Sequence, residues 1–139
     1  MKIQLKSILS AAICGFVLLL EAPSVAALTL TEIAKLLASD GEGFDVFGIS
    51  VAVAGDTAVI GATGDDDDGG NAGAAFVFLR SAGVWTEQAK LSAIDGAAPD
   101  QFGISVALEG DTVVIGAIFD DDSGNNSGAA YVFSRSAGV

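Results

Sequence analysis

The sequence FGISVAVAGDTAVIGAT at residues 47–63 decides the fold, because FGISVALEGDTVVIGAI at residues 102–118 repeats it. The same offset relates the segments that follow, GAAFVFLRSAGV at 73–84 and GAAYVFSRSAGV at 128–139, and no gap is needed. Internal similarity with a period near fifty residues is typical of solenoids, propellers and other repeat arrays. The pattern inside each unit decides among these architectures.

Each unit contains short runs of Val, Ile, Ala and Thr separated by turn signals. In the first unit, ISVAVAGD and TAVIGAT meet at the tight-turn pair Gly55-Asp56, AAFVFLR follows, and WTEQAKLSA at 85–93 alternates as a fourth run. A helical repeat would need apolar residues spaced three and four apart, which these runs lack. Four short antiparallel strands per unit predict an all-β fold of β-propeller blades. Phe47 and Phe102 are expected to fill the gap between neighbouring blades.

The repeat divides the chain into four parts. We expect a signal peptide, a lead-in, a first blade, and a second blade without a fourth strand of its own, at 1–27, 28–46, 47–93 and 94–139. In the lead-in, TEIAKL at 31–36 repeats TEQAKL of the first blade and is interpreted as an orphan outer strand. Three roles are open for it: to complete the last blade of a ring, to end a preceding degenerate blade, or to form a short helix. Two blades cannot close a ring alone, so further blades in the same protein or other copies are expected partners.

Residues 1–27 have the composition of a helical secretory signal peptide. Lys2 and Lys6 form a short basic region, and the apolar stretch at 8–20 is too short to span a bilayer comfortably. The protein is therefore expected to be secreted or at the cell surface, with no membrane span after cleavage; a retained N-terminal anchor is the alternative. Cleavage would remove Cys14, the only cysteine, and the chain has no histidine. These absences exclude disulfides, thiol catalysis, serine–histidine triads and the usual zinc sites in the mature chain.

The charge of the chain is strongly acidic. Its formal net charge is −12 and its pI is about 4.1. Such a balance argues against nucleic acid as a partner, because phosphates would be repelled. It suits an extracellular protein or one that binds cations.

The order of motifs within each unit resembles a known repeat. FGISVA, IGA, an acidic loop and GAAFVF follow one another as in the FG-GAP repeat of integrin alpha-subunit propellers and secreted bacterial propeller proteins. Phe47-Gly48 and Phe102-Gly103 match the FG element, Gly61-Ala62 and Gly116-Ala117 match the GA element, and Thr63 and Ile118 depart from the third position. The resemblance implies a β-propeller of about seven blades, an extracellular location, and adhesion or ligand recognition.

The acidic loops GDDDDGGNAGAA and FDDDSGNNSGAA offer oxygen ligands for a cation. The candidate ligands are Asp65, Asp67 and Asn71 in the first loop and Asp120, Asp122 and Asn126 in the second. Calcium takes six to eight oxygens from carboxylates, amides, carbonyls and water, whereas magnesium demands stricter geometry. The calcium loop of the resembled family reads D-x-D-x-D-G-x-x-D, and only the four aspartates match it, since Gly69 and Gly124 stand at the third acidic position. Calcium is thus the expected cofactor, and a solvated acidic turn is the alternative.

We therefore predict a secreted or cell-surface FG-GAP β-propeller segment that acts as a binding or adhesion module for a protein or glycan ligand. The sequence indicates no enzyme, because it offers no identifiable catalytic or cofactor-binding residues. Two alternatives remain open. The chain would be a non-catalytic blade pair of a larger secreted enzyme, or a carboxylate-dependent hydrolase of the kind that uses paired carboxylates on sugars.

Overall fold

The computed structural model describes residues 28–136, so the signal peptide expected at 1–27 lies outside the described residues. The chain divides into two units, residues 1–31 and 32–139, and the fold described below is that of the second unit. All of its regular structure is β-strand. Within 28–136 no helix is long and apolar enough to cross a membrane.

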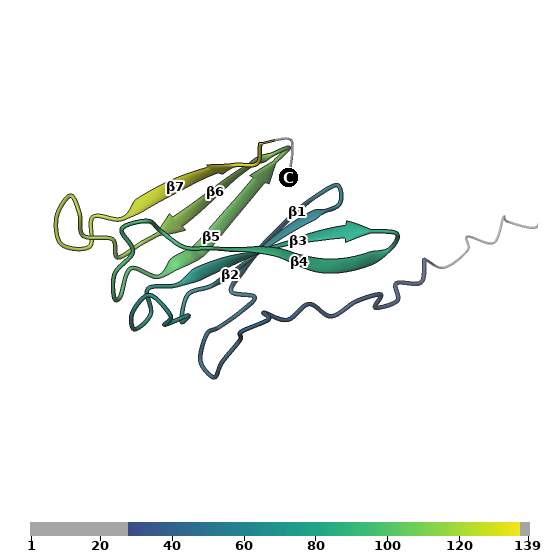
Figure 1. The fold of residues 1–139 in the computed structure, drawn as a ribbon, viewed down its shortest axis with the longest axis horizontal. Helices are drawn as coiled ribbons and strands as arrows, with labels where there is room; N and C mark the ends of the chain where they lie inside the picture. The colour runs from purple at the N-terminus through teal and green to yellow at the C-terminus, as the bar shows by residue number, and fades with distance from the viewer. Residues whose placement is uncertain (1–27, 137–139) are drawn as a thin grey trace, which may run out of the picture. The chain divides into compact units, whose positions relative to one another are not determined.

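Seven strands form two antiparallel sheets (Figure 1). The first sheet has the order β1-β2-β3-β4 and comprises β1 (Ser50–Ala54), β2 (Thr57–Ala62), β3 (Ala74–Ser81) and β4 (Val84–Leu91). The second sheet has the order β5-β6-β7 and comprises β5 (Phe102–Glu109), β6 (Thr112–Ala117) and β7 (Ala129–Ser134). These sheets are the two predicted blades, and the all-β prediction is confirmed. Among the described residues, the outer edge of β7 has no strand partner.

A two-residue turn sets the register of the first hairpin in each blade. Ala54 pairs with Thr57 across Gly55-Asp56, and Gly55 has the positive φ of 57° that such turns require. Asp56 also anchors the far end of β3, where its carboxylate lies 2.8 Å from the Arg80 guanidinium. The second blade repeats this ion pair between Asp111 and Arg135 at 2.6 Å. Both arginines therefore have a structural partner.

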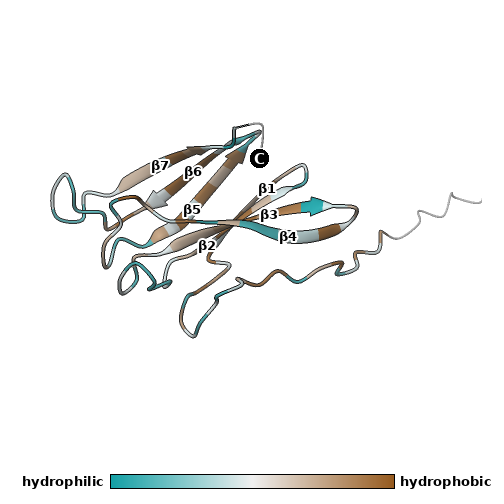
Figure 2. Cartoon of the chain, viewed as in Figure 1, coloured by the Kyte–Doolittle hydropathy of each residue, from teal (hydrophilic) through white to brown (hydrophobic). Residues whose placement is uncertain are grey.

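The blades pack face to face through a shared apolar layer. Val59 and Ala75 of the first blade meet Phe102, Val113 and Ile115 of the second, and all five are buried. Val113 and Ile115 share this face because every second side chain of a β-strand points to the same side of the sheet. In Figure 2 much of the length of the strands has hydrophobic colour, β3 and β4 carry hydrophilic stretches, and the loop between β6 and β7 is mainly hydrophilic. Phe102 is fully buried here, which confirms its predicted place between blades.

The opposite face of the first blade has its own apolar cluster. Phe76 and Phe78 lie at its centre, and Phe47 packs edge-on against both rings, with centroid separations of 5.5 and 6.2 Å. Leu36 and Ala38 of the lead-in cover part of this face. Residues 28–38 contain neither helix nor strand, so the segment TEIAKL is not paired with any described strand.

The glycines of the FG and GA motifs touch across the blade interface. A Cβ placed on Gly61 would collide with the carbonyl oxygen of Gly103, and one placed on Gly103 would collide with the carbonyl oxygen of Ala74. Ser50 strengthens the same contact, because its hydroxyl donates a 2.7 Å hydrogen bond to the Gly103 carbonyl. Small residues at these positions therefore allow two backbones to approach.

Candidate functional site

The two acidic loops adopt one conformation. In the β2–β3 loop the Gly73 amide donates to the Asp65 carbonyl at 2.9 Å, and in the β6–β7 loop Gly128 donates to Asp120 at the same distance. Asn71 and Asn126 both have positive φ, 59° and 53°, and both are exposed. Asparagine tolerates this left-handed conformation better than most residues. The recurrence of asparagine in the loops thus has a backbone explanation.

An ammonium group lies at the centre of the first acidic loop. Nζ of Lys90, on β4, lies 2.7 Å from Asp65 and 2.6 Å from Asp67, and Asp40 of the lead-in adds a third carboxylate at 3.0 Å. The ammonium also stands over the ring of Phe76, 5.4 Å from its centroid. Lys90 therefore neutralises the repulsion between aspartates that the bare sequence suggested.

Burial affects the charge states of Asp65 and Lys90 in this cluster. Asp65 is only 5 % exposed, and burial raises its pKa above the ordinary value although Lys90 opposes the shift. Burial also works against the charge of Lys90, but its hydrogen bonds to Asp65, Asp67 and Asp40 outweigh that effect and raise the pKa of the ammonium. Lys90 is accordingly a permanent cation at physiological pH.

The second acidic loop is organised around a phenol. The Tyr131 hydroxyl oxygen, on β7, lies 2.6 Å from a carboxylate oxygen of Asp120 and 3.0 Å from one of Asp95, and its single proton is shared between these two acceptors. Burial and these carboxylates raise the pKa of Tyr131, so its hydroxyl remains protonated. Hydrogen bonding with Asp95 and the nearby charge of Asp120 raise the pKa of Asp122. Negative charge in this cluster is therefore only partly relieved.

The two clusters are the same construction, related by the offset of the repeat. Asp95, Asp120 and Asp122 correspond to Asp40, Asp65 and Asp67, and Tyr131 corresponds to Phe76. The counterpart of Lys90 would lie on a fourth strand beside β7, and residues 28–136 place no strand there. Within residues 28–136, the three carboxylates of the second blade have no ammonium at the place that Lys90 occupies in the first blade.

Comparison with models of protein families identifies the family of the chain. The model of the FG-GAP repeat matches residues 30–78 and 85–133. The chain belongs to the FG-GAP repeat family. The two matches are related by the offset of the repeat. The second match starts in β4, the fourth strand of the first blade, and the first match starts in the lead-in. The lead-in therefore occupies the position in the first match that β4 occupies in the second. No curated protein matches the chain significantly.

Family membership supports the general functional class. FG-GAP repeats form β-propeller modules that often serve adhesion, and the family is generally non-catalytic. The two antiparallel sheets agree with consecutive propeller blades. The family prediction made from the FG and GA motifs is therefore confirmed.

In the first FG-GAP loop, an ammonium group lies where the sequence predicts a calcium ion. The side chain of Lys90 already occupies the point on which Asp65 and Asp67 converge. Among residues 28–136, no group of three or more histidine, cysteine, aspartate or glutamate side chains is arranged to hold a metal ion. Asp65 and Asp67 both contact Lys90, and the Asp122 amide donates to the Asp120 carboxylate. The exposed Asn71 and Asn126 have positive φ in the backbone turns. Calcium binding stays a prediction.

The sequence did not predict four residues of the two acidic clusters: Asp40, Lys90, Asp95 and Tyr131. The repeat itself carried the signal, because Asp40 and Asp95 are related by the same offset as the loop aspartates. Lys90 was visible as the repeated lysine of TEIAKL and TEQAKL. No local motif reveals these contacts, since they join segments that lie far apart in the sequence, as Asp40 and Lys90 do.

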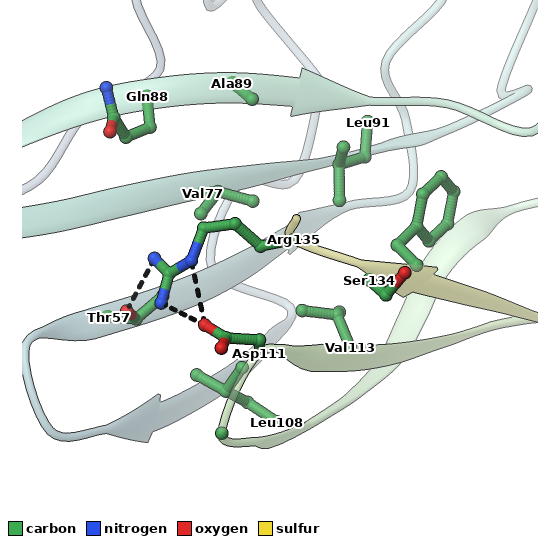
Figure 3. Close-up of a pocket in the computed structure, with 12 residues that line it drawn as sticks. Thr57, Val77, Gln88, Ala89, Leu91, Leu108, Asp111, Val113, Ser134 and Arg135 are labelled. Carbon is green, nitrogen blue, oxygen red and sulfur yellow. Dashed lines mark hydrogen bonds and ion pairs between the residues drawn. The ribbon is translucent and has the colours of Figure 1, made fainter. Parts of the chain in front are cut away.

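A groove of about 490 Å³ lies between the two blades, bordered by β4 and β7 (Figure 3). Its apolar lining consists mainly of Val77, Leu91, Leu108, Val113 and Phe133. Arg135 reaches across the mouth of the groove, donating to Asp111 at 2.6 Å and to Thr57 at 3.5 Å. The groove lies beside the strand of the second blade that has no outer partner among the described residues.

Proposed function

We propose that this FG-GAP chain is a secreted or cell-surface binding module and that its acidic loops present the binding face. The observation that carries the proposal is the grouping of the loops at one end of the blades (Figure 1). The Gln101 amide of the second blade donates to the Asn71 carbonyl of the first at 3.0 Å, and the Phe102 amide donates to Ala72 at 2.9 Å. These bonds support a single rigid surface rather than two independent loops.

The charge of this surface favours a basic ligand. Its exposed carboxylates are those of Asp66, Asp67, Asp68, Asp121 and Asp122. Like charges on a rigid face attract a complementary partner and raise its association rate. A protein ligand carrying lysine and arginine side chains therefore suits the module better than an acidic glycan.

Binding of a lysine-rich peptide and of neutral and acidic oligosaccharides to the immobilised full chain tests the proposal. The triple variant Asp66→Asn/Asp68→Asn/Asp121→Asn removes three exposed charges that make no ion pair in the described residues. Glu109→Gln, an exposed carboxylate next to the β5–β6 turn, is the matched control. We expect the triple variant alone to lose peptide binding. Equal binding by both variants, or a preference for acidic oligosaccharides, would contradict the proposed surface.

Export is tested separately by sequencing the N-terminus of the protein recovered outside the producing cell. The small residues before Leu28 predict cleavage after Ala26 or Ala27. A protein that stays cell-associated with residues 1–27 intact would instead support the retained anchor.

A further inference from the structure

The two blade faces that are free in this structure are repeats of the two faces that are in contact. The first blade packs on the second through Val59, Ala75 and Val77. Their counterparts in the second unit are Val114, Ala130 and Val132, which are exposed on the outer face of the second blade. Val132 is 68 % exposed. The second blade thus exposes a copy of a surface that the first blade buries.

The reverse relation holds on the outer face of the first blade. Val106 and Leu108 of the second blade pack against the shared apolar layer. Their counterparts Val51 and Val53 are 70 % and 69 % exposed. Residues 28–136 therefore carry both halves of one interface on opposite faces, each without a partner among those residues.

The close-approach glycines repeat the same relation. Gly61 and Gly103 abut backbone of the neighbouring blade, as described above. Their counterparts Gly116 and Gly48 abut no other backbone, and a Cβ on Gly48 would meet nothing within 4 Å. The space for a second backbone contact is thus present on both free faces.

The lead-in already lies where a preceding blade would end. Leu36 and Ala38 pack on the outer face of the first blade, whereas their counterparts Leu91 and Ala93 pack in the layer between blades. Leu91 ends β4, so Leu36 marks the corresponding end of a strand that belongs to a neighbouring blade. Ile33 is 81 % exposed. The segment 31–36 thus has the sequence and the endpoint of a fourth strand without a sheet.

We propose that copies of this chain join head to tail, with the second blade of one copy docked on the outer face of the first blade of the next. Segment 31–36 of that next copy pairs with the free edge of β7 and completes the sheet. Its Lys35, the counterpart of Lys90, enters the cluster of Asp95, Asp120 and Asp122.

Charge and edge chemistry favour a second copy over an unrelated occupant. An ammonium placed as Lys90 is in the first blade would pair with these three carboxylates, and Lys35 stands in the same sequence context as Lys90, TEIAKL against TEQAKL. The unpaired edge of β7 presents backbone donors and acceptors that a strand satisfies. The apolar groove beside this edge offers burial for the docking strand (Figure 3).

The mass of the full chain, measured by light scattering on eluting particles, tests the proposal with two variants. Val51→Asp and Val132→Asp each block one free face, and both side chains are exposed, so folding should persist by circular dichroism. We expect the wild-type chain to form a multiple of its own monomer mass and each variant to be monomeric. An equimolar mixture of the two variants should form a dimer, because each retains the face that the other lacks. Val84→Asp, exposed at the start of β4, is the control and should assemble normally.

Lys35→Met provides a second readout. It should weaken assembly roughly tenfold, because it removes the cation from a partly buried carboxylate cluster, and leave the melt of the Val51→Asp monomer unchanged. A wild-type chain that stays monomeric up to its solubility limit would overturn the proposal. So would assembly that survives both aspartate substitutions, or a variant mixture that stays monomeric.

Discussion

The carbonyl oxygen of Gly103 lies against the α-carbon of Gly61, so closely that no side chain fits between them. Gly103 belongs to the FG motif of the second blade and Gly61 to the GA motif of the first. The two most recognisable features of the repeat therefore form a contact between blades. The glycines of both motifs set the spacing between neighbouring sheets. The contacts within a single blade do not explain why glycine stands at these positions.

Gly61→Ala should destabilise the protein by about 3 kcal/mol, because the added methyl group meets rigid backbone. Gly116→Ala is the matched change in the second blade. There the new methyl group meets mainly the side chains of Ser105 and Ile104, which can move, so the cost should stay below about 1 kcal/mol. Urea unfolding of both variants in the monomeric Val51→Asp background gives the comparison. Equal losses would show that the contact between blades does not set the requirement for glycine.

Ser50→Ala should cost about 1 kcal/mol, because the Gly103 carbonyl loses the 2.7 Å bond from the hydroxyl. Ser105 holds the same position in the second blade, and in the described residues its hydroxyl makes no bond to another blade. Ser105→Ala should therefore leave the unfolding of the monomer unchanged. The denaturant midpoints of the two variants, measured side by side, test this prediction. A larger loss of stability for Ser105→Ala than for Ser50→Ala would contradict the stabilising role of the Ser50 hydroxyl.

Lys90→Met should destabilise the protein by about 2–3 kcal/mol at pH 7, because it leaves the buried Asp65 carboxylate without its cation. The loss should shrink as the pH falls toward about 4, where carboxylates begin to bind protons. The pKa of Asp65 is raised in the folded state, so the folded protein binds more protons than the unfolded chain, and acid favours folding at this site. Thermal unfolding of variant and wild type from pH 7 downward measures the difference.

The control for this experiment is Lys35→Met in the Val51→Asp monomer. Lys35 is exposed, so its removal should change stability little at any pH. A loss for Lys90→Met that grows with acid would show that the ammonium does not compensate the charge of Asp65.

Calcium should stabilise Lys90→Met more than the wild-type chain. In the wild type, the ion would have to displace an ammonium held by Asp40, Asp65 and Asp67, whereas the variant leaves that point open. A ligand that binds the folded state alone raises the unfolding temperature, and the rise grows with its concentration relative to Kd. Melting with and without excess calcium measures the effect, and adding Asp67→Asn to the variant should cancel it. Equal stabilisation of wild type and variant would place calcium elsewhere.

The sequence was sufficient for the blades because each strand carries its own signal. Gly55-Asp56 predicts the first hairpin, and the alternation in AAFVFLR and WTEQAKLSA predicts the next. The repeat then confirms each assignment by a second occurrence. The structure of the lead-in could not be predicted in this way. Whether TEIAKL forms a strand depends on an available sheet edge, and the local sequence does not show whether such an edge is present.

The candidate site was only half predictable for a related reason. The paired aspartates are local in sequence, so their convergence in each loop could be foreseen. The cation among these aspartates could not be foreseen. Lys90 contacts Asp65 from β4, which follows β3 in the sequence, and Asp40 belongs to the lead-in before β1. Asn71 illustrates the opposite error: a residue type suited to ligation recurs because its backbone conformation requires it.

Zero-length carbodiimide coupling of lysine to aspartate tests the central claim most directly, because it joins only groups that are in contact. Coupling of Lys90 to Asp67, whose charged atoms lie 2.6 Å apart, is the internal control. In a mixture of ¹⁴N- and ¹⁵N-labelled full chains, we predict coupling of Lys35 to Asp120 or Asp122 in peptide pairs that carry one light and one heavy partner. Coupling at Lys90 without any mixed pair containing Lys35 would contradict the claim that one copy completes the acidic cluster of the next.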